Sequence, residues 1–147
     1  QSQQVNQPDS MKYLPFTPSP KLHSEIRANA KKIGNYLANS FIRLALDNYF
    51  KQNHFYSAFG TETATAAYTL LNAGIGSDLI SNKRTLFSFY ISVNNLTNTA
   101  YQNHLSRLKY LAENNATGRM GIFNMGRNFS IKLIIPFAIK KKSTKMK

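Results

Sequence analysis

The chain has 147 residues and a formal charge of +13, with 19 Lys and Arg residues against 6 Asp and Glu residues. It has no cysteine, which excludes disulfide bonds, thiolate catalysis and cysteine-ligated metal sites. No run of about 18 apolar residues occurs either. This excludes a transmembrane helix but leaves membrane strands open, because half of their residues can be polar.

The N-terminal part of the sequence mixes irregular and extended patterns. Residues 1–9 are polar and lack a period, and residues 11–16 are predicted to form a short strand. Residues 17–20 hold two prolines and are predicted to be a connection. Residues 21–30 fit a strand and, equally well, a helix that continues to Leu37. The alternating segments that follow favour the strand.

Four later segments alternate between apolar and polar residues, which is the pattern of a strand with one apolar side. They are residues 36–50, residues 68–79, the strand that starts at Thr85, and residues 126–137. The apolar side of the sheet is predicted to carry Ile42, Leu44, Leu46, Phe87, Phe89, Ile91, Val93, Ile131, Leu133, Ile135 and Phe137. The polar side is predicted to carry Glu25, Arg27, Arg43, Asp47, Asn94 and Lys132.

The connections between these segments alternate in length. Short turns are predicted at residues 31–35 and 81–84, and long loops at residues 51–67 and 98–124. From Tyr101 onward the second loop has leucines at helical spacing, which indicates a helix. Short turns at one end and long loops at the other are typical of an up-and-down membrane barrel. The sequence therefore predicts an all-β antiparallel meander of about five to six amphipathic strands.

The polar side of the predicted sheet indicates which solvent the apolar side meets. A closed soluble barrel needs apolar side chains in its interior, whereas the set that would face inward here is rich in charged and amide groups. We therefore expect the apolar side to face lipid and the polar side to line a water-filled lumen. Glu25 and Asp47 could be taken for a catalytic pair, but are expected to be partners of Arg27 and Arg43 in that lumen.

Three sequence segments resemble those of a known family. They are residues 94–101 (NNLTNTAY), residues 62–72 (ETATAAYTLLN), and the Gly126-Arg127-Asn128-Phe129 segment that opens the last alternating run. In this order and at these spacings, they resemble the C-terminal part of TonB-dependent outer-membrane receptors, in particular those of the Bacteroidetes.

The resemblance implies the C-terminal portion of a 22-stranded transmembrane barrel in the bacterial outer membrane. It implies no enzymatic activity and no cofactor. It implies energised uptake of a scarce nutrient, such as a ferric siderophore, together with a plug domain that contacts an energy-transducing TonB-type protein. Because about five strands are matched and no plug is, we expect residues 1–137 to be a receptor fragment that needs the remainder of the receptor chain. Residues 138–147 are expected to be a basic, disordered tail.

The family resemblance also points to ligand-binding residues in the two long loops. They are His54, Phe55, Tyr56, Tyr101, His104, Arg107 and Tyr110. The alternative is that aromatic residues form the girdle at the membrane edge, which we favour for Tyr49, Phe50 and Phe137. The three histidines lie in separate segments without ligand spacing, so no metal site is predicted.

The competing hypothesis is a soluble, basic α+β module that binds nucleic acid. In it, residues 21–37 and 101–113 would be helices that cover the apolar side of the sheet, and the positive charge would meet phosphates. The sequence has no compact basic patch and no RNA-binding aromatic motif, so we favour the receptor, which has no nucleic-acid partner.

Overall fold

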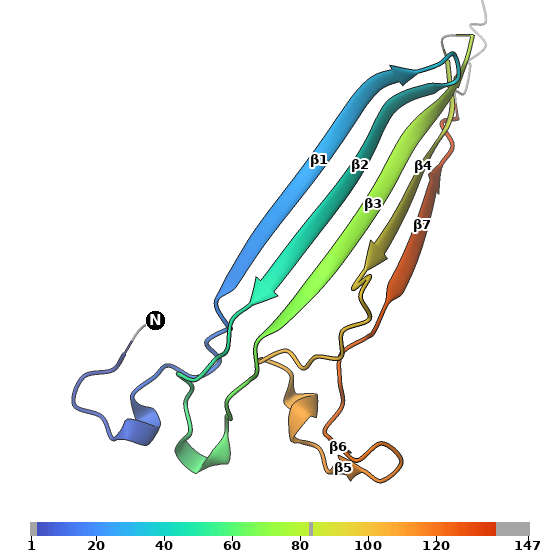
Figure 1. The fold of residues 1–147 in the computed structure, drawn as a ribbon. Helices are drawn as coiled ribbons and strands as arrows, with labels where there is room; N and C mark the ends of the chain where they lie inside the picture. The colour runs from blue at the N-terminus through green and yellow to red at the C-terminus, as the bar shows by residue number, and fades with distance from the viewer. Residues whose placement is uncertain (1–2, 83, 138–147) are drawn as a thin grey trace, which may run out of the picture.

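A single five-stranded antiparallel sheet makes up most of the protein (Figure 1). It is seen in a computed structural model that describes residues 3–82 and 84–137. The strands lie in the order β1-β2-β3-β4-β7 and are β1 (Lys21–Ile33), β2 (Leu37–Tyr49), β3 (Tyr68–Ser81), β4 (Arg84–Asn94) and β7 (Asn128–Ile134). Each strand pairs with the next one along the sheet, so the predicted all-β antiparallel meander is confirmed.

The connections differ in length at the two ends of the sheet (Figure 1). At one end, short turns join β1 to β2 and β3 to β4. At the other end, the two long connections gather together with the N-terminal segment. These longer segments contain three 3₁₀ turns and a small hairpin, namely η1 (Asp9–Met11), η2 (Ala58–Gly60), η3 (Arg107–Tyr110), β5 (Glu113–Asn114) and β6 (Arg119–Met120). We call this end of the molecule the loop cluster.

The register separates the two faces of the sheet, because residues directly opposite each other in antiparallel strands share a face. One row runs across all five strands and is wholly apolar: Ala28, Ile42, Ile75, Ile91 and Ile131. The adjacent row on the other face is Arg27, Arg43, Gly74, Ser92 and Ser130. In the apolar row Ile42 is 55% exposed and Ile131 is 78% exposed, so this side is not covered by the rest of the described chain.

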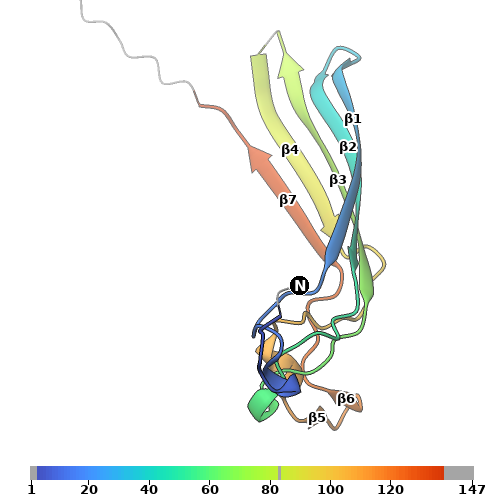
Figure 2. The same ribbon diagram turned by 90° about the vertical axis from the view of Figure 1, so that its left-hand side faces the viewer.

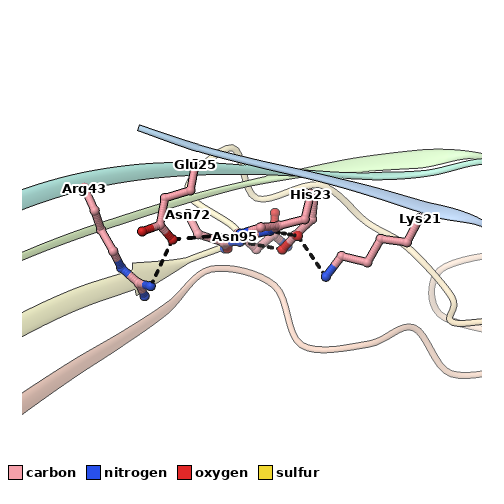
Figure 3. A network of polar contacts seen from close by, with 7 residues as sticks. Lys21, His23, Glu25, Arg43, Asn72 and Asn95 are labelled. Carbon is pink, nitrogen blue, oxygen red and sulfur yellow. Dashed lines mark hydrogen bonds and ion pairs between the residues drawn. The ribbon is translucent and has the colours of Figure 1, made fainter. Parts of the chain in front are cut away.

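The sheet is curved, with β4 and β7 bending away from β1 to β3 (Figure 2). The polar side chains lie on the inner side of this curve (Figure 3). There, the rings of Phe41 and Tyr90 close over β3 from its two neighbouring strands, with centroids 6.1 Å apart. A Cβ atom at Gly76 would lie 2.6 Å from each ring, so this close approach requires glycine.

Several predicted elements differ from the structure. The predicted strand over residues 11–16 is wrong, since this segment follows η1 as a loop with a single bridge from Tyr13 to Gln3. The predicted helix after Tyr101 is also wrong, since backbone groups there are satisfied by the short turn η3 and by the β5–β6 hairpin. The last strand ends at Ile134, so Ile135 and Phe137 lie beyond it, both exposed.

Neither helix required by the nucleic-acid hypothesis is present. Residues 21–33 form β1, and residues 101–113 hold the 3₁₀ turn η3 and the first residue of β5. Within residues 3–82 and 84–137, no helix is long and apolar enough to cross a membrane. The predicted tail, residues 138–147, lies outside the described residues.

Candidate ligand-binding site

A polar network ties the loop-cluster end of the sheet together (Figure 3). The carboxylate of Asp47 on β2 is its centre. Its Oδ1 lies 2.8 Å from Lys21 Nζ and 2.6 Å from His23 Nδ1, both on β1. Its Oδ2 accepts a hydrogen bond of 2.9 Å from the Asn72 amide on β3, and Asn72 Oδ1 accepts one of 3.0 Å from the backbone N–H of Asn95. Three strands and the start of the second long connection are therefore held by one chain of contacts.

The six residues predicted for the polar side all lie on one face by register, but their partners differ in part from expectation. Glu25 pairs with Arg43 at 3.5 Å, as expected of a carboxylate beside arginines. Asp47 has Lys21 and His23 as partners and no arginine, because Asp47 lies near the loop-cluster end of β2, whereas Arg43 lies in the middle of that strand. Arg27 instead lies over the Phe41 ring, with its guanidinium carbon 4.1 Å from the centroid.

The asparagine-rich segment after β4 forms a tight, hydrogen-bonded turn. Asn95 and Asn98 both adopt positive φ, 53° and 55°, which asparagine tolerates better than most residues. The Asn95 amide binds the backbone of Thr99 twice, through its Nδ2 to the carbonyl and through its Oδ1 to the N–H. Asn98 Oδ1 accepts a hydrogen bond of 3.0 Å from the N–H of Arg127, which comes just before β7. The turn thus fixes where the last strand begins.

Three tyrosines stack in a ladder where the sheet meets the loop cluster. The ring centroids of Tyr49 and Tyr68 lie 4.5 Å apart, and those of Tyr68 and Tyr101 lie 4.6 Å apart. Stacking at these distances adds to the free energy gained by burying the rings. The ladder positions Tyr101, a predicted ligand residue, at the start of β3.

The interior of the loop cluster is polar. Glu62 is only 5% exposed, and its carboxylate accepts hydrogen bonds from the backbone N–H groups of Phe16 (2.6 Å) and Tyr56 (3.0 Å). Gln52 is fully buried, and its Nε2 donates to the carbonyls of Thr17 and Pro18. The first long loop is present as predicted but is partly packed, because these side chains satisfy backbone groups that the folded loops remove from water.

His104 is part of this polar interior. It is 4% exposed, and its Nδ1 lies 2.8 Å from the hydroxyl oxygen of Thr65, which also accepts a hydrogen bond of 2.9 Å from the ammonium of Lys109. Because Thr65 accepts from Lys109, its own hydroxyl hydrogen is free to donate to a neutral His104. Burial, reinforced by the charge of Lys109 and opposed by that of Glu62, lowers the pKa of His104 below its usual 6.5.

The loop cluster should therefore loosen in acid. A histidine whose pKa is lower in the folded state is protonated first in the unfolded state, so stability is complete above pH 6.5 and falls as the pH drops from 6.5 toward the folded-state pKa. We expect backbone amide protection around Thr65 to fall between about pH 7.5 and 5.5, as measured by hydrogen exchange with correction for the intrinsic rate. His104→Gln should remove this dependence, and His54→Gln, at an exposed position, should leave it intact.

A cleft of about 510 Å³ opens between the two long connections. Its walls are small and aromatic residues with a few polar groups: Thr63, Ala64, Thr65, Ala66, Ala67, Tyr68, Ala100, Tyr101, Gln102, Lys109, Tyr110, Met120 and Phe123. This volume lies in the usual range of small-molecule sites. The cleft is therefore the candidate binding site of the described part of the chain.

The predicted ligand residues are distributed unevenly around this cleft. Tyr101 and Tyr110 line it, whereas His104 and Arg107 line a smaller, neighbouring pocket. The three predicted residues of the first loop do not line it: the His54 ring packs at a tilt against the Tyr13 ring, with centroids 4.9 Å apart. Phe55 and Tyr56 are half-buried and are also absent from the cleft walls. Lys109 and Phe123 also line the cleft but were not predicted as ligand residues, since neither belongs to a recognisable motif.

Comparisons of the chain with protein-family models, with curated proteins and with solved structures found no match. The two faces of the sheet and the cleft are therefore the features from which function can be inferred.

Proposed function

We propose that this chain forms part of the barrel wall and outer loops of a TonB-dependent outer-membrane receptor. In this role it contributes to energised uptake of a scarce nutrient, a ferric siderophore or a similar small molecule, and it is not an enzyme. The observation that carries the proposal is the uncovered apolar row across all five strands, opposite a polar inner face.

The two faces favour lipid outside and water inside. Each apolar side chain gains roughly 1.5 to 3 kcal/mol when it leaves water, so the uncovered apolar row strongly favours contact with hydrocarbon. On the inner face, the ion pairs of Asp47 and Glu25 would be costly in a dry interior but are inexpensive beside a wet lumen. The two long connections both lie at one end of the sheet and the short turns at the other, which is the arrangement found in transmembrane barrels.

The edges of the sheet indicate what the partners would be. Within the described residues, β1 and β7 each pair on one side only, so each presents unpaired backbone groups. Inside a bilayer the hydrocarbon offers no hydrogen-bond partners to such edge groups, so further strands are required to close a barrel. The remainder of the receptor chain would supply those strands and a plug that contacts the TonB-type protein, and outer-membrane lipid would surround the wall.

The absence of cysteine allows a direct test by site-directed spin labelling. Single cysteines would be placed in β7, one at a time, at Phe129, Ser130, Ile131, Lys132 and Leu133 in the receptor reconstituted into lipid vesicles. We expect labels at the odd-numbered positions to be accessible to oxygen dissolved in lipid, and labels at 130 and 132 to be accessible to a water-soluble nickel chelate. Nickel accessibility at all five positions would contradict the proposal.

A further inference from the structure

Lys109 is the most unusual residue of the cleft. It is 8% exposed, and its ammonium donates hydrogen bonds of 3.0 Å to the Thr63 carbonyl and 2.9 Å to the Thr65 hydroxyl. It also lies 4.9 Å from the centroid of the Tyr110 ring. An ammonium has three N–H groups, and these contacts use two of them as hydrogen-bond donors. All of these partners line the cleft, so the charge lies in its wall.

The charge of Lys109 has no carboxylate partner among residues 3–82 and 84–137. Glu62, a buried carboxylate of the loop cluster, already accepts hydrogen bonds from two backbone N–H groups. On the neighbouring hairpin, the Glu113 carboxylate lies beside Gly118, where one of its oxygens would be 3.7 Å from a Cβ atom added to that glycine. A buried ammonium without a counter-ion is unfavourable, and an anion in the cleft would relieve that cost.

The remaining walls of the cleft suit a flat, apolar group. No Asp or Glu lines it, and its surface is built from four alanines, Met120 and the rings of Tyr68, Tyr101, Tyr110 and Phe123. Aromatic rings stack on flat partners, and small residues leave room for one. The guanidinium of Arg119 lies 5.1 Å from the Phe123 ring centroid, which adds a second positive charge beside the cleft.

We infer that the cleft binds a ligand in which an anionic oxygen group is joined to a flat apolar body, with aromatic carboxylates as the simplest members. The carboxylate meets the free N–H of Lys109, and the ring lies against Tyr101. This inference names a chemical class for the cargo of the proposed receptor. It rests on the proposed function only in treating the bound ligand as cargo.

A matched pair of probes tests the charge requirement. The receptor in zwitterionic detergent micelles would be titrated with 6-fluoro-2-naphthoate and with the neutral 6-fluoro-2-naphthamide, with fluorine NMR line widths corrected against empty micelles. We expect the carboxylate to bind at least about tenfold more tightly than the amide, which is the effect of one charge-assisted hydrogen bond. Equal affinity for the two probes would overturn the inference.

Two variants and a control locate the effect. Lys109→Met should bring the two affinities within about twofold of each other, whereas Lys51→Met, which removes an exposed charge from the other long connection, should preserve the preference. Ala66→Trp fills the cleft without touching the hydrogen bonds of Lys109 and should weaken both probes by about tenfold. If Lys109→Met does not fold, Ala66→Trp decides, because unchanged binding in that variant rules out the cleft.

This outcome is separate from that of the spin-label test. A chain that shows the alternating lipid accessibility but no carboxylate preference remains a receptor, and its cargo is of another class. A chain that prefers the carboxylate but shows nickel accessibility along all of β7 keeps its anion-binding cleft and loses the receptor assignment.

Discussion

Replacement of Ile91 by lysine should destabilise the receptor barrel by roughly 2 to 4 kcal/mol in lipid vesicles. Ile91 lies on β4 between Ile75 and Ile131 in the apolar row, and this row crosses β2 and β3 near their midpoints. A lysine at that place would bring an ammonium to the middle of the hydrocarbon layer, and the side chain is far from either membrane surface toward which it could extend. The measurement is the free energy of unfolding in urea, followed by tyrosine fluorescence or by the mobility of the folded barrel.

Ser92→Lys is the matched control for this experiment. Ser92 is the next residue of the same strand and lies on the polar face, opposite Gly74 and Ser130. The same charge introduced there should change stability by less than about 1 kcal/mol, since it meets a wet lumen. If the two lysines cost the same, the assignment of the two faces is wrong.

Gly121→Ala should disorder the second long connection, at a cost of roughly 2 to 5 kcal/mol. Gly121 has φ 68°, a conformation that costs an alanine about 1 to 2 kcal/mol. A Cβ there would also overlap the backbone of Lys109, which cannot rotate away as a side chain can. Overpacking of this kind adds about 1 to 3 kcal/mol. Because the displaced backbone is that of Lys109, binding of 6-fluoro-2-naphthoate should be lost in the same variant.

The hairpin between β5 and β6 offers a control with the same backbone conformation. Gly118 has φ 64°, but the only atom within 4 Å of a Cβ there is a Glu113 carboxylate oxygen at 3.7 Å. Gly118→Ala should therefore cost only the free energy of the left-handed backbone conformation, about 1 to 2 kcal/mol. Limited proteolysis of residues 101–124 would compare the two variants, and equally rapid cleavage of both would show that the contact with Lys109 does not matter.

The strands were predictable because their signal is local. Alternation between apolar and polar residues follows from the geometry of an extended backbone and needs no knowledge of the neighbours. It predicted that Ile42, Ile91 and Ile131 share one side of the sheet, and the register places them in one row. Two other patterns failed: residues 11–16 do not form the predicted strand, and the helical spacing of leucines after Tyr101 does not produce a helix.

The candidate site was less predictable, since its residues come from separate connections. Tyr101 and Tyr110 could be chosen from their place in a long loop, but nothing local to Lys109 indicates that it is buried in the wall of a cleft. Its burial follows from Thr63 and Thr65, more than forty positions away, which supply its hydrogen bonds. In the same way, the contact of His104 with Thr65 follows from no local pattern, and contact of His104 with ligand stays a prediction.

The sequence by itself determined which residues share a face of the sheet, which connections are short, and that no cysteine chemistry takes place. Only the tertiary structure decided that the long connections enclose a polar interior, that three tyrosines stack across two strands and a loop, and that Lys109 has no carboxylate beside it in the described part of the chain. The physical reason is that periodicity acts over neighbouring residues, whereas burial and charge compensation depend on groups that the fold brings together from distant parts of the chain.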